Sequence, residues 1–517
     1  HVLIRDVAYG TLPKKVRAQK HAEIATFIED RAGDRGESVI AMVADHLGRA
    51  ASIGADSSLE PAELEPIRDR AHDSLERAGD VASSLYSNQE AMAHYEAAMD
   101  IDSDVCKHPD ARARIAEKLG DVASRLGRVD RAVEIWERCL EYHRGEEDLA
   151  RVADLLRKIG AGLWNKGDRE GAIAHYQRGI DLLKDGEPCL ELVRLYEEAA
   201  SLYMSAGDNM LAIYASEKAL RLAMRMGEVA AASRAHGIFG RGFSRIGDSE
   251  RARQNLERSV ELAHDSDPAE AVRALLALGH HFEVSEANYA EAATAYGEAL
   301  QIAERTGDLP NQVELHASLS TLALHRGEWP EVEAGTETVA ALIEREGLTG
   351  KLCFPHLLRG AVRWHEGDTA GAGRSLRRAA ELAEQVGRSE VAFQALHWLA
   401  RAQCDAGEHA DADQTLARAL DTCERAGLVA HSVEANASRA VNQAIWGHDD
   451  QARRLAEEAA GLAERLPYPV GTAAALEATG VATRDATGLE GARKAWADLG
   501  RPVDAERVDR LAASLAG

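Results

Sequence analysis

The sequence predicts an all-α chain: a right-handed α-solenoid of about eleven helical hairpins that follows a short N-terminal helical region. Two observations carry this prediction. Turn-forming residues recur every 40 residues along almost the whole chain, and apolar residues between them are spaced three and four apart, as on one face of a helix. A fixed period of this length is typical of stacked supersecondary units, which present long surfaces to partners.

The turn positions define the period. Eight of the eleven are glycine, a residue that adopts left-handed backbone at a helix end at little cost. The eleven positions are Ser87, Gly127, Gly167, Gly207, Gly247, Ala287, Gly327, Gly367, Gly407, Gly447 and Thr487. Nine of them are followed five residues later by an alanine: Ala132, Ala172, Ala212, Ala252, Ala292, Ala372, Ala412, Ala452 and Ala492. Each turn is therefore expected to join two helices of a hairpin.

A second glycine stands seven residues before several of these turns, inside the first predicted helix. A glycine within a helix is destabilising, so its best justification is the close approach of a neighbouring helix. We expect this at Gly120, Gly160, Gly240, Gly360 and Gly480, with the alanines of the second helix serving the same purpose.

Composition excludes several classes of function. Lys and Arg number 61 against 86 Asp and Glu, a formal net charge of −25, which argues against nucleic acid and anionic membranes as partners. No apolar run is long enough to span a bilayer. The six cysteines have no paired or metal-ligand spacing, so we expect buried free thiols in a reducing, cytoplasmic compartment: Cys106, Cys139, Cys189, Cys353, Cys404 and Cys423.

One period carries the pattern of a known repeat. Leu119-Gly120, the turn at Gly127, Ala132, Trp136 and Cys139 resemble the Leu-Gly pair, turn, small residue, aromatic and small residue of the tetratricopeptide repeat (TPR). The resemblance covers residues 62–500, with a unit of 40 residues in place of the usual length of about 34. Residues 501–517, in which charged and apolar positions alternate, are predicted to form a C-terminal capping helix.

The front of the chain does not follow the repeat. The string from His1 to Tyr9, with Leu12, Arg17 and His21, resembles the end of the winged-helix segment that follows the ATPase domain in STAND-type signalling ATPases. These include cyclase–ATPase–TPR proteins and ATP-dependent transcription regulators. The resemblance implies that residues 1–50 end such an ATPase-linked helical region and that an ATPase lies upstream. Residues 51–61 are predicted to form an acidic loop before the solenoid.

No pattern points to chemistry within the chain. The nearest approach to a phosphate-binding loop, Gly347 to Lys351, lacks the full spacing and has Leu352 where a Mg²⁺-binding hydroxyl would stand. The histidines form no metal-ligand set. We therefore expect no catalytic residue, no cofactor and no metal site, and interpret the chain as a non-enzyme.

The TPR resemblance implies a binding surface, because in that family the first helix of each hairpin lines the concave face. On this chain the implied groove positions are Arg194, Arg234, Arg241, Arg245, His281, His325, Trp364, His365, His397 and Arg401. Basic and aromatic residues thus gather in a chain of net charge −25, which favours a protein or peptide ligand that is acidic or phosphorylated. The alternative is that these are ordinary exposed helix positions paired with acids of adjacent repeats.

Two functions remain open at this stage. The chain is either the sensor and interaction module of a multidomain signalling ATPase, binding a partner or inducer on its concave face, or a free-standing TPR scaffold that assembles complexes.

Overall fold

The computed structural model describes residues 9–33, 36–85, 87–101, 109–145, 148–264, 267–466 and 468–516. Residues 1–8, which open the string that resembles a winged-helix segment, and Cys106 lie outside them. Helices and their connections make up the described residues, which contain no strand. The all-α prediction is confirmed. The chain divides into two compact units, residues 1–187 and 188–517.

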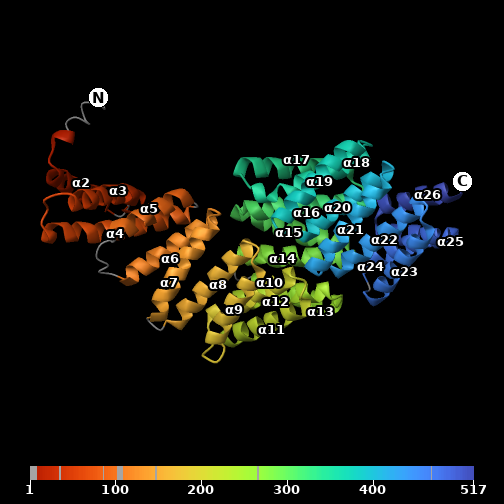
Figure 1. The fold of residues 1–517 in the computed structure, drawn as a ribbon, viewed down its shortest axis with the longest axis horizontal. Helices are drawn as coiled ribbons and strands as arrows, with labels where there is room; N and C mark the ends of the chain where they lie inside the picture. Colours follow the sequence, from red (N-terminus) through yellow and green to blue (C-terminus); the bar gives the residue numbers. More distant parts are fainter. Residues whose placement is uncertain are drawn as a thin grey trace. The chain divides into compact units, whose positions relative to one another are not determined.

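The first unit is a succession of helices in which each one packs against the next (Figure 1). They are α2 (Lys14–Ala32), α3 (Gly36–Ala55), α4 (Pro61–Ser84), α5 (Asn88–Ile101), α6 (Pro109–Arg125), α7 (Val129–Gly145), α8 (Leu149–Asn165) and α9 (Arg169–Leu183). Because α3 extends to Ala55, the loop predicted over residues 51–61 is confined to residues 56–60.

The second unit continues the same pattern. Its helices are α10 (Leu190–Ser205), α11 (Asn209–Met226), α12 (Val229–Arg245), α13 (Ser249–His264), α14 (Pro268–Val284), α15 (Tyr289–Thr306), α16 (Leu309–Arg326), α17 (Trp329–Glu346), the 3-10 turn η2 (Thr349–Lys351), α18 (Cys353–His365), α19 (Thr369–Gln385), α20 (Ser389–Asp405), α21 (His409–Ala426), α22 (Val429–Trp446), α23 (Asp449–Arg465), α24 (Pro469–Thr483), α25 (Ala486–Asp498) and α26 (Pro502–Ala516). Within this unit each helix contacts the one that follows it, and each even-numbered helix from α10 to α24 also contacts the next even-numbered helix. The first helices of the hairpins therefore form one continuous layer.

The predicted turns have the expected backbone. All eight predicted turn glycines have positive φ, and Ala287 adopts the same left-handed conformation at φ 51°. The acid after the turn caps the following helix: the carboxylates of Asp168 and Asp368 accept hydrogen bonds from the N–H groups of Gly171 and Gly371. The eleventh turn differs from the prediction, because its left-handed residue is Arg484 and Thr487 already lies in the first turn of α25.

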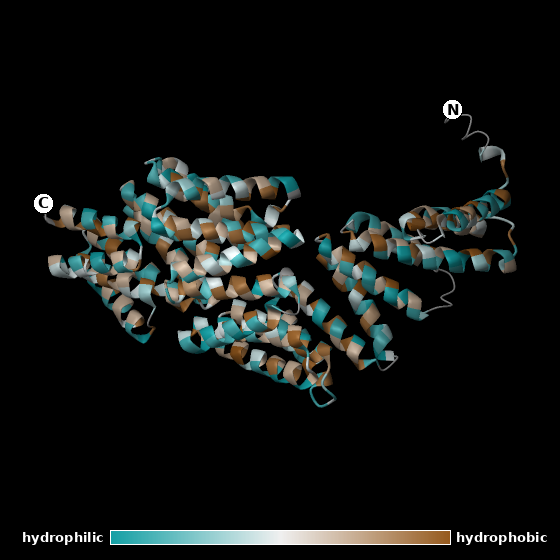
Figure 2. Ribbon diagram, turned by 180° about the vertical axis from the view of Figure 1, so that it is seen from behind, coloured by the Kyte–Doolittle hydropathy of each residue, from teal (hydrophilic) through white to brown (hydrophobic). Residues whose placement is uncertain are grey.

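Each hairpin is held by small residues that meet large ones. A Cβ placed on Gly360 would stand 2.5 Å from Cγ of Leu376, and one on Gly160 would stand 2.5 Å from the ring of Tyr176. The predicted close approaches at the helical glycines are thereby confirmed. Polar and apolar residues alternate along the helices (Figure 2), so that each one buries one face and exposes the other.

The second unit also makes contacts between parts far apart in the sequence. The side-chain amide of Asn209, at the start of α11, donates to the carbonyl of Gly427, before α22, at 3.3 Å. Near the C-terminus, α26 packs against α24 and α25 and also reaches α16. The layer of even-numbered helices therefore curves, so that the turn between α10 and α11 meets the turn between α21 and α22, and α26 meets α16.

Candidate functional site

All ten predicted groove residues lie in the second unit, on helices of the even-numbered layer. Arg194 is on α10; Arg234, Arg241 and Arg245 are on α12; His281 is on α14 and His325 on α16; Trp364 and His365 are on α18; His397 and Arg401 are on α20. The structure gathers five of them around two cavities on the inner side of this layer.

The first cavity, here called the arginine pocket, has a volume of about 440 Å³. Four arginines line it: Arg241, Arg245, Arg273 and Arg388. The only acids among its lining residues are Glu314 and Glu390. The helices α20 and α22 begin at its wall, since residues 387–391 and 427–431 also line it. Helix N-termini carry free N–H groups and partial positive charge, so the wall adds to the attraction for an anion.

Both glutamates of the arginine pocket are engaged by cations. Glu314 is bound by Lys351 and, at 3.0 Å, by Arg388. Glu390 pairs with His280 at 3.0 Å and with Arg245 at 3.5 Å. The structure thus satisfies these two acids internally.

Arg241 differs from the other cations of the arginine pocket. Its side chain is accessible to solvent inside the cavity, and it has no hydrogen bond or ion pair among the described residues. Loss of surrounding water lowers the pKa of Arg241, and the nearby Arg245 lowers it further. A guanidinium so placed retains all of its donors for a ligand.

Arg245 joins two segments of the second unit that are far apart in the sequence. Its guanidinium donates to the carbonyl of Met204 at 2.7 Å and to that of Ala426 at 3.0 Å, which joins the ends of α10 and α21. Arg234 is likewise occupied, because it bridges Glu197 at 3.2 Å and Glu270 at 2.8 Å. These two predicted ligand-binding arginines therefore already have partners within the protein.

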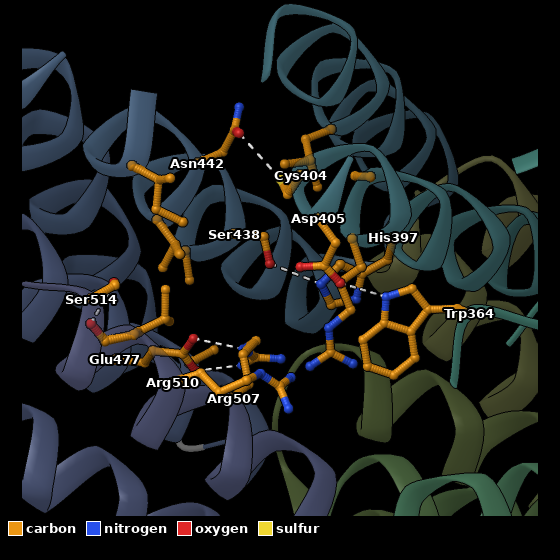
Figure 3. A pocket seen from close by; sticks show the side chains of 18 residues that line it. Trp364, His397, Cys404, Asp405, Ser438, Asn442, Glu477, Arg507, Arg510 and Ser514 are labelled. Carbon is orange, nitrogen blue, oxygen red and sulfur yellow. Dashed lines mark hydrogen bonds and ion pairs between the residues drawn. The ribbon is translucent and has the colours of Figure 1, made fainter. Parts of the chain in front are cut away.

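The second cavity, here called the C-terminal pocket, has a volume of about 330 Å³ and is lined from α18, α20, α21, α22, α24 and α26 (Figure 3). It collects the predicted residues Trp364, His397 and Arg401. The indole N–H of Trp364 donates to Asp405 at 2.7 Å, and Nε2 of His397 shares a hydrogen bond of 2.8 Å with Ser438. Arg401 lies over the ring of Trp398 and pairs with Asp504 of α26.

A buried layer of charge separates the two cavities. His325 pairs with Glu283 at 3.5 Å, and His431 pairs with Glu434 at 3.0 Å. The desolvated Glu434 keeps a pKa of about 2, because the hydrogen bond and charge of His431 outweigh its burial. This layer leaves little room for a ligand, since the cavity beside it measures only about 50 Å³.

Five predicted residues line neither cavity. Two of them, Arg234 and His325, are held in the ion pairs described above, and the other three are Arg194, His365 and His281. Arg194 is exposed on α10, and His365 stacks on Trp329 with ring centroids 4.0 Å apart. His281 is 1% exposed and shares a hydrogen bond with Ser244, so it is not available to a partner.

The neighbour of His281, His280, occupies the groove position instead. The reason is a shift of register: the close-approach glycine of this repeat is Gly279, packed against Tyr296, one residue before the position that the period predicts. The turn that follows, over residues 285–288, is correspondingly longer.

Sequence reasoning missed several residues of the cavities, among them Arg273, His280, Arg388 and Arg510. Arg388 lies between hairpins, next to the left-handed Gly387. The signal that could have located it is a second series of positive-φ glycines, offset by half a period from the first: Gly227, Gly307, Gly347, Gly387 and Gly427.

Comparison with known proteins gives similar structures but no similar sequence. No protein-family model and no curated protein matches the chain. The apo form of RapI is 13% identical and has a TM-score of 0.44, with 53% of this chain and 99% of that chain covered. A Rap protein in complex with competence and sporulation factor is 14% identical, at a TM-score of 0.44 with 79% and 99% covered.

The apo form of the quorum sensor NprR from B. thuringiensis is also similar, at 12% identity and a TM-score of 0.46, with 66% of this chain and 91% of that chain covered. Similarity at this level assigns neither a ligand nor a partner to this chain. Among the described helices, none is both long and apolar enough to cross a membrane.

Proposed function

We propose that this chain is a protein-interaction module whose arginine pocket binds an anionic segment of a partner, an acidic or phosphorylated peptide. The observation that carries the proposal is Arg241, a guanidinium without a partner in a cavity that already holds three other arginines. A charge-assisted hydrogen bond to such a group is stronger than one between neutral groups.

The charge balance of the arginine pocket supports the same ligand class. Four arginines face two glutamates, and both glutamates are bound by cations of the protein. The surplus is positive in a chain whose net charge is −25. A positive cavity in an acidic protein attracts anions locally while the rest of the surface repels them, which favours entry of a ligand with an acidic segment rather than a uniformly acidic protein.

The test is binding of a fluorescein-labelled hexaglutamate peptide and of a phosphoserine peptide, measured by fluorescence anisotropy. Arg241→Ala is expected to weaken binding by about tenfold or more, since a hydrogen bond to a charged group contributes about 1.5–3 kcal/mol. Added salt is expected to weaken binding as well. Arg194→Ala is the matched control, because Arg194 is an exposed arginine of the same layer outside the pocket.

Two results would contradict the proposal. One is equal affinity of wild type and Arg241→Ala for both peptides. The other is hexalysine binding as tightly as hexaglutamate. Neither variant is expected to alter thermal unfolding, because both side chains are solvent-accessible.

A larger context is also proposed, on the resemblance of the first residues alone. The chain would act as the sensor arm of a signalling ATPase, with ligand capture in the arginine pocket biasing the state of the ATPase. The alternative remains a free-standing scaffold. Reading the intact gene upstream of His1 separates the two: an ATPase with a phosphate-binding loop supports the first, and a start codon close to His1 supports the second.

A further inference from the structure

The C-terminal pocket has a floor of apolar side chains. They come from five helices and comprise Ala400, Leu416, Ala437, Val441, Ile445, Ala474 and Leu511. Ile445 is 43% exposed although its neighbours in the cavity are largely covered. An apolar floor open to water, with a few polar groups at its edge, is typical of a small-molecule site.

Most polar groups at the edge of the C-terminal pocket are already paired. Glu477 accepts from Arg507 at 2.9 Å and from the indole N–H of Trp496 at 2.8 Å. Asp405 accepts from Trp364. The guanidinium of Arg401 lies over the rings of both Trp364 and Trp398, where a ligand cation would otherwise bind.

Arg510 is the exception at this edge. It lines the pocket, is exposed, and has no hydrogen bond or ion pair among the described residues. Arg507, Arg510, Leu511 and Ser514 lie three and four residues apart on α26, so one face of this helix presents an apolar side chain beside a free cation (Figure 3). This juxtaposition is complementary to a molecule with an apolar body and an anionic end.

We propose that the C-terminal pocket binds a small amphipathic carboxylate, with its apolar chain on the floor at Ile445 and its carboxylate on Arg510. One water molecule, which has one non-hydrogen atom, occupies about 30 Å³ of the liquid. By the same measure a cavity of about 330 Å³ holds on the order of ten non-hydrogen atoms. This matches a medium-chain acid. The site is distinct from the arginine pocket, because the two cavities share no lining residue.

The test is isothermal titration calorimetry of the full chain with octanoate, octanol and octylamine, three probes with the same apolar chain and a different end. Octanoate is expected to bind at one site and octylamine to bind at least tenfold more weakly. Arg510→Ala is expected to weaken octanoate binding about five- to thirtyfold and to bring it close to that of octanol. Arg454→Ala, an exposed arginine of α23 outside the pocket, is expected to leave it unchanged.

A second variant tests the floor. Ile445→Asp places an anion under the apolar chain at a position that is already exposed, so it is expected to abolish octanoate binding while thermal unfolding stays close to that of wild type. The proposal is overturned if octanoate produces no saturable heat at millimolar concentration. It is also overturned if octanoate and octylamine bind alike, or if neither Arg510→Ala nor Ile445→Asp changes the affinity.

Discussion

At the scale of the residue, two histidines of the inner surface are shifted in opposite directions. Burial lowers the pKa of His397 to about 4, although Glu434 raises it. The pKa of His280 is raised, because Glu390 lies 3.0 Å away and its charge outweighs the loss of surrounding water. The fold therefore favours the neutral form of His397 and the charged form of His280.

These shifts predict opposite effects of pH on stability. Because the folded-state pKa of His397 lies below the unfolded value of about 6.5, its contribution is present above that value and is lost as pH falls from about 6.5 toward 4. For His280 the folded-state pKa is higher than the unfolded-state value. The contribution of His280 to the stability of the fold is therefore present below about pH 6.5 and is lost as pH rises through the folded-state pKa.

The measurement is the temperature of thermal unfolding against pH for His397→Gln and His280→Gln. His397→Gln is expected to lose less stability than wild type between pH 6.5 and pH 4. His280→Gln is expected to lose less than wild type when pH rises above 6.5. Identical pH profiles for the two variants would show that neither histidine is coupled to folding as the structure indicates.

At the scale of the element, the hairpin depends on where its glycines stand. A Cβ on Gly360 would lie 2.5 Å from Leu376, whereas a Cβ on Gly297, within α15, would meet nothing within 4 Å. Gly360→Ala is expected to destabilise the second unit by about 1–3 kcal/mol through overpacking. Gly297→Ala is expected to stabilise it by about 0.5–1 kcal/mol, because alanine is the better helix former. Denaturant unfolding of both variants measures the difference in sign.

The elements were the part of the structure that the sequence best predicted. Turn, cap and close-approach positions are local, so each repeat displays them: Gly127 ends a helix, and Gly120 packs under Trp136. The groove was predicted less completely. A single extra residue near Ala287 moves His280 into the position expected for His281, and a period cannot reveal such a shift without the backbone.

The sequence also could not predict which groove residues have hydrogen-bond partners within the protein. Arg245 and Arg241 are four residues apart on α12 and look equivalent in the repeat. One is tied to Met204 and Ala426, and the other has no partner. The difference depends on a segment about 180 residues further along the chain, which approaches only because the small rotation from each repeat to the next accumulates.

At the scale of the whole molecule, this curvature brings two turns of the second unit into backbone contact. Gly207 and Gly427 are both left-handed, and a Cβ on Gly427 would lie 2.5 Å from Cα of Gly207. The contact borders the arginine pocket, whose wall includes Ser205 and Gly427. The shape of the proposed anion site thus depends on closure of the second unit and not on any one hairpin.

Gly427→Ala tests this dependence, with Gly307→Ala as its control, since Gly307 does not line the arginine pocket. Both glycines end a helix at positive φ, so alanine incurs the same left-handed cost of about 1–2 kcal/mol at each. At Gly307 a Cβ would meet nothing within 4 Å, whereas at Gly427 it would collide with the backbone of Gly207. Gly427→Ala alone is therefore expected to separate the two turns, to accelerate hydrogen exchange over residues 204–212 and 426–434, and to weaken binding of hexaglutamate. If the two variants exchange alike over these residues, the contact between the turns does not hold the second unit closed, and the arginine pocket is formed by its helices independently of that closure.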